Sequence, residues 1–175
     1  MTTATSGSAV AALREKLGDR LQSVEEFRGQ TTVVIDRGAI QIACRTLHDD
    51  PGLQFDLLAA LTAVDYWPQE PRFSVVYQLY SIPRNLFLGL RVPLRSQSAE
   101  LASIEAIYPN ANWHEREVFD MFGITFSGHS DLRRILMPAD WVGHPLCKDY
   151  PQGYEEVQFT FNYDEIDRRK PYAKS

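Results

Sequence analysis

Cysteine is scarce in this chain of 175 residues, in which only Cys44 and Cys147 occur. Two thiols so far apart in the sequence cannot supply a disulfide framework, a zinc–thiolate centre or an iron–sulfur cluster. We therefore expect a protein of a reducing compartment that holds no metal through its thiols.

Positive charge and long apolar runs are also scarce. Lysine and arginine total 18 against 23 aspartates and glutamates, so the formal net charge is −5 and nucleic acid is disfavoured as a partner. The longest mostly apolar run, residues 57–64, is far shorter than the roughly 20 residues that cross a bilayer. No secretory signal is expected, because the first basic residue, Arg14, follows the only short apolar stretch near the N-terminus. Any membrane association should therefore run through a partner.

Catalytic motifs are missing as well. The chain contains no G-x-S-x-G, Walker or G-x-G-x-x-G pattern, so no motif indicates acyl transfer, nucleotide binding or flavin binding. His114-Glu115 opens like a zincin helix, but Val118 stands where that motif needs its second histidine. We predict no catalytic residue and no cofactor-binding residue in this chain.

One alternative of a different class is a free-standing metal-dependent hydrolase. Its candidate ligands are His129, Asp131 and His144, together with Glu115 or Asp120. No pair of these residues has ligand spacing on a single element, and histidines in turns more commonly hydrogen-bond the backbone. We therefore predict no metal site and keep the hydrolase as an alternative.

The composition is that of a folded globular domain, with 44% hydrophobic and 23% charged residues. Val10, Leu13 and Leu17 predict a helix over residues 9–18, and similar patterns predict helices over 40–47 and 98–108. Strands are predicted over residues 31–35, 61–66, 73–80 and 86–92, with short loops between the last three that favour antiparallel neighbours. The order indicates an α+β fold: a single domain with a mostly antiparallel or mixed β-sheet covered by helices, followed by an extended irregular C-terminal segment.

A further helix is predicted from Asn112, which forms a capping-box-like start with Glu115, to Gly123, a typical helix stop. One stripe of this helix contains Glu115, Val118, Phe119 and Phe122, and the other contains Trp113, Arg116, Glu117 and Asp120. Because Arg116 and Asp120 are four residues apart, we expect that they can pair. Phe122 is expected to fill the core.

Residues 124–151 contain glycines and prolines that interrupt every long period, yet they remain rich in apolar side chains. A long connection without regular structure is usually functional. We therefore divide the chain into an N-terminal arm with a short helix (residues 1–30), an α+β domain ending in the Glu-Arg-Glu helix (31–123), and an extended interface segment with its tail (124–175). In the tail, residues 157, 159, 161 and 163 alternate as an apolar strip, which forms either an edge strand of the chain's own sheet or an arm on another subunit.

Several motifs in the second half resemble one family. They are the string from Glu115 to Ile124, then Gly128-His129, residues 131–136, Pro138, Asp140-Trp141, residues 143–146 and residues 148–151, with residues 61–66 upstream. Together they resemble the C subunit of the proton-pumping NADH-quinone oxidoreductase, respiratory complex I. Two positions depart from the pattern of that family, which typically has proline in place of Ser130 and arginine in place of Cys147.

The resemblance implies a non-cofactor-binding accessory subunit that scaffolds the quinone-reducing module. FMN, iron–sulfur clusters and quinone would belong to partner subunits, and this chain would pack chiefly against the subunit that forms the quinone pocket. It would be peripheral to the cell inner membrane on the cytoplasmic side and reach the membrane only through the complex. The alternatives are the equivalent subunit of a membrane-bound hydrogenase or of a ferredoxin-fed plastid-type complex, and a soluble binding module unrelated to respiration.

The resemblance also implies which residues face a partner. These are Glu115, Arg116, Glu117, Asp120, His129, Asp131, Arg133, Arg134, Pro138, Trp141, His144, Pro145, Lys148, Asp149, Tyr150, Phe159 and Phe161. For Arg133 and Arg134 we expect counter-charges on the partner, so that reversing both charges weakens assembly more than folding.

Overall fold

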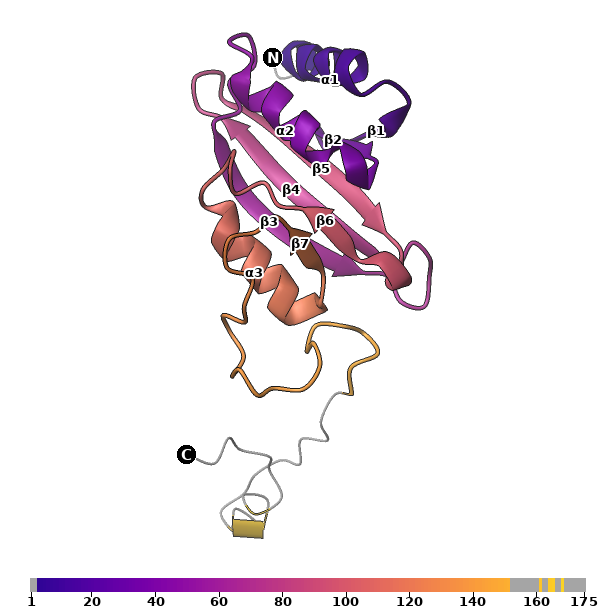
Figure 1. Ribbon diagram of the computed structural model, residues 1–175. Helices are drawn as coiled ribbons and strands as arrows, with labels where there is room; N and C mark the ends of the chain where they lie inside the picture. The colour runs from indigo at the N-terminus through magenta and orange to yellow at the C-terminus, as the bar shows by residue number, and fades with distance from the viewer. Residues whose placement is uncertain (1–2, 152–160, 162–163, 166–167, 169–175) are drawn as a thin grey trace.

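The structure is a computed structural model that describes residues 3–151, 161, 164–165 and 168 (Figure 1). Its helices are α1 (Thr3–Leu17), α2 (Ile40–Asp49) and α3 (Ala111–Phe122), with single 3-10 turns at Gly18–Arg20, Arg37–Ala39 and Ser96–Ser98. Its strands are β1 (Leu21–Phe27), β2 (Gln30–Ile35), β3 (Leu57–Asp65), β4 (Phe73–Ser81), β5 (Leu86–Leu94), β6 (Glu100–Ala102) and β7 (Thr125–Ser127). Among the described helices, none has the length and apolar content needed to cross a bilayer.

Five strands form one mixed sheet in the order β1-β2-β5-β4-β3. The hairpin β1–β2 and the meander β3–β4–β5 are antiparallel, and β2 joins β5 in parallel. This confirms the predicted α+β class with a mixed sheet. The expected boundary at residue 30 falls inside the β1–β2 hairpin, so the second part of the predicted arm lies in the sheet.

The helices all lie on one face of the sheet. Figure 1 shows α2 in front of the strands, with α1 beyond it at the top of the view and α3 beside β3. Buried side chains of all three helices, such as Leu13 of α1, Cys44 of α2 and Val118 of α3, belong to the same hydrophobic core as Tyr77 of β4, so the helices face the same side of the sheet. The core fills this layer, with Leu79, Leu88 and other side chains fully buried between sheet and helices. The opposite face of the sheet carries no helix in the described part of the chain.

The predicted helix over residues 98–108 is wrong. Residues 100–102 form β6, which pairs in parallel with β7, and the following residues form tight turns in which Ile104 accepts hydrogen bonds from the N–H groups of Ile107 and Tyr108. The apolar residues of the pattern, Leu101, Ile104 and Tyr108, are nevertheless buried. The backbone is extended here because the N–H groups of residues 103 and 104 donate to Ser127 O (2.9 Å) and to the Glu115 carboxylate (2.8 Å).

Two strands differ from the sequence-based expectation. The sequence does not predict β1, because its side chains are exposed or half-buried and carry no apolar alternation. Strand β3 begins at Leu57 instead of residue 61, with an irregularity between Leu58 and Ala60.

Helix α3 differs from the prediction at its start and agrees with it at its end. It begins at Ala111, and the side chain of Asn112 does not cap it but donates to Glu105 (2.9 Å) and Ser130 (3.2 Å). Gly123 ends the helix in the left-handed conformation, with φ of 75°. Phe122 packs against the core but is only partly buried.

Adjacent residues of β5 provide a test of the one-sided core. Leu88 is fully buried, whereas Phe87 on the other face is exposed. We expect Leu88→Ala to lower the free energy of unfolding by about 3 kcal/mol because it leaves a cavity in the core. Phe87→Ala should cost about 1 kcal/mol at most, because it leaves no cavity and removes only the cross-strand contact with Tyr80. Urea denaturation of both variants measures the difference, and equal losses would contradict the assignment of the two faces.

Candidate functional site

The segment that follows β7, residues 128–151, is called the C-terminal wrap below. It contains no helix or strand, yet it is held around the C-terminal end of α3. The last carbonyls of a helix lack partners within the helix. Here the carbonyl oxygen of Met121 accepts from Leu146 N–H (3.0 Å), and that of Phe122 accepts from the Cys147 thiol (3.4 Å). The wrap therefore supplies partners for the last two carbonyl groups of α3, in addition to the cap that Gly123 forms.

A buried carboxylate, Asp120, organises the middle of the wrap. Its Oδ2 accepts hydrogen bonds from three consecutive N–H groups, those of Ile135 (3.0 Å), Leu136 (2.8 Å) and Met137 (2.8 Å). Its Oδ1 accepts from Arg134 Nη1 at 2.6 Å. Burial alone would raise the pKa of Asp120, but these hydrogen bonds outweigh it and lower the pKa. The carboxylate is therefore held ionised inside the protein.

The partner of that carboxylate, Arg134, connects distant parts of the wrap. Its Nη2 donates to the carbonyl oxygens of Trp141 (3.0 Å) and Gly143 (2.9 Å), and its Nη1 also donates to Asp120 O (3.3 Å). His144 Nδ1 lies 2.9 Å from the same Asp120 carbonyl oxygen. The several N–H donors of the guanidinium thus fix a segment that has no helical or β-sheet hydrogen bonds of its own.

These contacts correct two expectations. The predicted Arg116–Asp120 pair does not form, because Arg116 instead donates to the carbonyl oxygens of Arg133 (3.2 Å) and Arg134 (3.3 Å). The counter-charge of Arg134 is Asp120 of the same chain, not a group on a partner. Arg133 also has a carboxylate within the chain, Asp131 at 2.8 Å, although both side chains are exposed.

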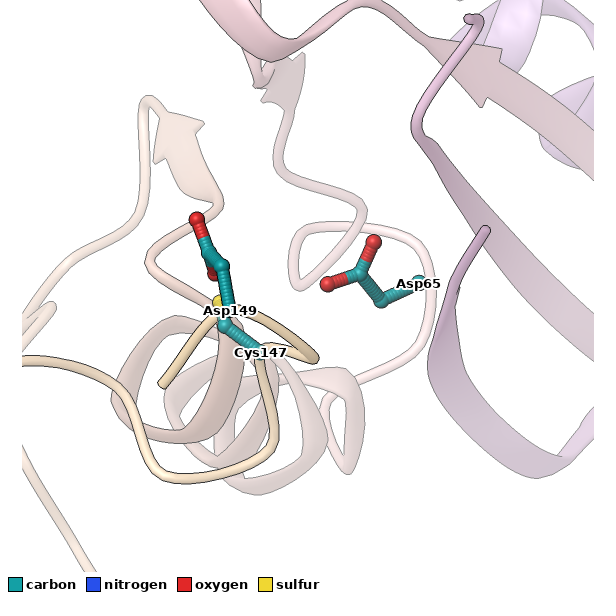
Figure 2. A group of neighbouring side chains, drawn as sticks. All are labelled: Asp65, Cys147 and Asp149. Carbon is teal, nitrogen blue, oxygen red and sulfur yellow. The ribbon is translucent and has the colours of Figure 1, made fainter. Parts of the chain in front are cut away.

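A second charged cluster fixes the far end of the wrap to the sheet (Figure 2). Asp65, at the end of β3, accepts from Arg72 Nε (3.0 Å) and Nη2 (2.9 Å) and from Lys148 N–H (2.8 Å). Arg72 also contacts Asp149 at 2.5 Å and 3.1 Å. Burial would raise the pKa of Asp65, but its hydrogen bonds lower that pKa to about 2. The cluster therefore connects residues that are more than 80 positions apart in the sequence.

Figure 2 shows that Asp65, Cys147 and Asp149 lie together, and one potential ligand atom from each falls within 4.8 Å of the others. The arrangement does not fit a metal ion well. The Arg72 guanidinium already bridges both carboxylates, and burial raises the pKa of the Cys147 thiol, which favours the protonated form over the thiolate that binds metals. In the described part of the chain, this is the one such group of three potential ligands, so the His129–His144 set of the hydrolase alternative is not assembled.

A third polar cluster fixes the start of the wrap. Glu115 is fully buried, and its carboxylate accepts from Ile104 N–H (2.8 Å) and Ser103 Oγ (2.6 Å). The buried His129 side chain accepts from Asp131 N–H (3.0 Å), and its Nε2 lies 3.1 Å from Asn112 O and 3.9 Å from Glu115 Oε2. Burial raises the pKa of Glu115, against the lowering effect of its hydrogen bonds. These groups join α3, β6 and the wrap.

The residues implied as partner contacts therefore divide into two sets. The side chains of Glu115, Arg116, Asp120 and His129 are buried inside this chain and leave no surface for a partner. Residues 117, 131, 133, 138, 148 and 149 are exposed, and residues 134, 141, 144, 145 and 150 are half-buried. Phe161 is exposed, and the rest of the apolar strip of the tail, Phe159 included, lies outside the described residues. Sequence reasoning missed the most exposed apolar side chains of this region, which are Trp113 (61%), Leu136 (61%), Val142 (86%) and Leu146 (54%).

Neighbouring arginines test the internal role of Arg134. We expect Arg134→Ala to lower the free energy of unfolding by about 3 kcal/mol, because it leaves the buried Asp120 charge without its partner. Arg133→Ala removes only an exposed pair and should cost under about 0.5 kcal/mol. Urea denaturation and trypsin cleavage within the wrap measure the effect. Equal behaviour of the two variants would show that Asp120 does not hold the wrap.

The Asp65 cluster predicts a dependence of stability on pH. Because the pKa of Asp65 is about 2 in the folded chain and roughly 3.9 in an unfolded one, the unfolded state binds more protons in between. The stabilisation is complete above the unfolded value and is lost as the pH falls towards the folded value. We expect the stability difference between the wild type and Asp65→Asn to shrink when urea denaturation is repeated from pH 6 down to about pH 2.5. A constant difference would contradict the role of the charge.

Comparison with known proteins identifies the family of this chain. The family of the respiratory-chain NADH dehydrogenase 30 kDa subunit matches residues 33–156. The C subunit of NADH-quinone oxidoreductase from Roseiflexus sp. (strain RS-1) is 49% identical over 162 residues, 93% of each chain, and that of Geobacter sulfurreducens is 46% identical over 149 residues, 85% of this chain and 91% of the relative.

Solved structures show the same fold. The trypsin-resistant fragment (1–134) of Nqo5 is 28% identical, with a TM-score of 0.58, and the match covers 70% of this chain and 98% of the fragment. A chain of the membrane-bound sulfane sulfur reductase, an archaeal respiratory membrane complex, has the same fold at 20% identity, with a TM-score of 0.64 and 97% and 96% coverage. The chain belongs to the family of the respiratory-chain NADH dehydrogenase 30 kDa subunit, alongside the C subunits of NADH-quinone oxidoreductases.

Proposed function

We propose that this chain is a non-cofactor-binding accessory subunit of a proton-translocating NADH-quinone oxidoreductase. It scaffolds the quinone-reducing module, so that electrons pass from NADH to quinone through FMN and iron–sulfur clusters held by partner subunits. Its main partner is the subunit that forms the quinone pocket. The chain is peripheral to the inner membrane on the cytoplasmic side and reaches the membrane through the complex.

The observation that carries this proposal is a set of exposed apolar side chains, called the apolar surface below, on a fixed irregular segment and the helix beside it. Leu136, Val142 and Leu146 project from the wrap, and Trp113 projects from the adjoining helix α3, all with more than half of their surface exposed. Exposed aromatic and aliphatic side chains among polar ones are typical of protein–protein interfaces. Exposed charged residues of the same segment include Asp131, Arg133 and Lys148.

The anchoring contacts favour a scaffold over a catalyst. Asp120, Arg134, Asp65 and Arg72 all direct their charges to groups within the chain, where they fix the wrap. A segment that is ordered before binding loses little conformational entropy when a partner covers it. The buried charges therefore support affinity indirectly, by presenting the apolar side chains in one arrangement.

Assembly in the native cell tests the proposal. The chain is tagged at its N-terminus, membranes are solubilised in mild detergent, and the tagged material is separated on a native gel stained for NADH dehydrogenase activity. Co-migration with a large NADH-oxidising assembly is the expected result. A large assembly without that activity would point to the hydrogenase or ferredoxin-fed relatives, and a lone soluble species would overturn the proposal.

Charges placed on the apolar surface should block this assembly. We expect Val142→Asp combined with Leu146→Asp to reduce the incorporated fraction at least about tenfold, because the carboxylates would have to be desolvated at the interface. Ile42→Asp, at an exposed position of α2, is the control and should assemble normally. Thermal unfolding of the purified chains should be similar for all three proteins. Normal assembly of the double variant would place the interface elsewhere.

A further inference from the structure

The face of the sheet opposite the helices carries a row of apolar side chains at one end. Adjacent strands place Phe27 opposite Gln30, Leu57 opposite Tyr80, and Tyr80 opposite Phe87. The parallel pairing of Thr32 with Gly89 extends the row from Gln30 to Phe87, two residues earlier on each strand. One residue from each of the five strands thus forms a continuous row, in the order 27, 30, 87, 80 and 57.

This row, called the aromatic row below, is exposed although four of its five members are aromatic or aliphatic. Phe27 is 72% exposed, Phe87 55% and Leu57 39%. The rings of Tyr80 and Phe87 pack together with their centroids 4.4 Å apart. The next positions inward on the same face are polar or small, in the order 25, 32, 89, 78 and 60. Glu25 of this inner row pairs with Arg91. Large apolar side chains are therefore interrupted directly behind the row.

The length and position of the row indicate which kind of secondary structure in a partner can cover it. Five strands spaced roughly 4.8 Å apart make the row about 19 Å long, a distance that about 13 residues of α-helix span. The row lies on a face and runs across the strands, so strand addition at a sheet edge would not cover it. A helix crossing the strands would place side chains at i, i+3, i+4 and i+7 along it.

The charges beside the row indicate which charge the helix should carry next to its apolar stripe. Two exposed arginines, Arg28 and Arg84, lie in the turns that border the row. Arg28 lies over the Phe27 ring, 5.2 Å from its centroid, and Arg84 donates to the Pro51 carbonyl oxygen at 3.2 Å. Neither forms a salt bridge with any residue that the structure describes. The acidic neighbour Asp56 is already engaged, since its carboxylate accepts from Ile82 N–H at 3.2 Å.

We propose that the aromatic row is a second docking surface, which binds an amphipathic helix of a partner protein whose apolar stripe is bordered by aspartate or glutamate. The apolar stripe covers the row, and the acidic border pairs with Arg28 and Arg84. This surface lies on the open face of the sheet and shares no residue with the C-terminal wrap, so one chain can contact two partners at once.

Photo-crosslinking in the native assembly tests this surface. Phe87 is replaced by p-benzoylphenylalanine in the full chain, cells are irradiated, the tagged assembly is purified, and the cross-linked peptide is identified by mass spectrometry. The expected product is a segment of another subunit with apolar residues at i, i+3, i+4 and i+7 and acidic residues beside them. In the same labelled background, Arg84→Glu should lower the cross-link yield at least about fivefold through charge repulsion.

Arg45→Glu, on the exposed side of α2, is the matched control and should leave the yield unchanged. A cross-link to a second copy of this chain, to a segment without the acidic helical pattern, or no cross-link at all would overturn the proposal. A cross-link yield that is the same with and without Arg84→Glu would also overturn the proposal. Because the labelled chain can still co-migrate with the NADH-oxidising assembly in each of these cases, failure here is separate from failure of the proposed subunit role.

Discussion

The buried Asp120 carboxylate is the contact on which the C-terminal half of this protein depends. It lies in the last turn of α3 and accepts hydrogen bonds from Arg134 and from three consecutive backbone N–H groups. A chain without helix or strand has few ways to satisfy its backbone groups in one arrangement. Here a single carboxylate accepts from all three N–H groups and pairs with the arginine that donates to the carbonyl oxygens of Trp141 and Gly143. The cost of burying two charges is offset because each has several partners.

Much of the fold follows from local patterns in the sequence. Period-two alternation over residues 73–80 and 86–92 predicts β4 and β5 and their antiparallel pairing, and the apolar face of residues 40–47 predicts α2. The helix predicted over residues 98–108 is wrong, although Leu101, Ile104 and Tyr108 repeat at helical spacing. Their burial agrees with the pattern, but the N–H groups of Ser103 and Ile104 donate to Ser127 O and to the Glu115 carboxylate, later in the chain, and these bonds hold the backbone extended. Spacing alone cannot show such distant partners.

The charged residues of the site are harder to interpret for the same reason. Their types and positions draw attention to residues 112–151, but a charge that faces a partner and a charge that is buried within the chain look alike in a sequence. Arg116 and Asp120 stand at pairing distance on one helix, yet each binds a segment that follows β7. Asp65, which holds the end of the wrap, accepts directly from Lys148 N–H and is joined to Asp149 through Arg72. These residues are too far apart in the sequence for local spacing to predict the contacts.

The polar clusters show what Ser130 and Cys147 do at the two positions where the family typically has proline and arginine. Ser130 donates to Glu105 through both its N–H (2.8 Å) and its Oγ (3.1 Å), and a proline at this position could make neither bond. Two hydrogen bonds therefore fix the turn that a proline ring would otherwise stiffen. At Cys147 the substitution leaves two carboxylates, Asp65 and Asp149, with the single cation Arg72. An arginine there would balance the remaining negative charge, whereas the thiol instead caps Phe122 O and strengthens the contact with α3.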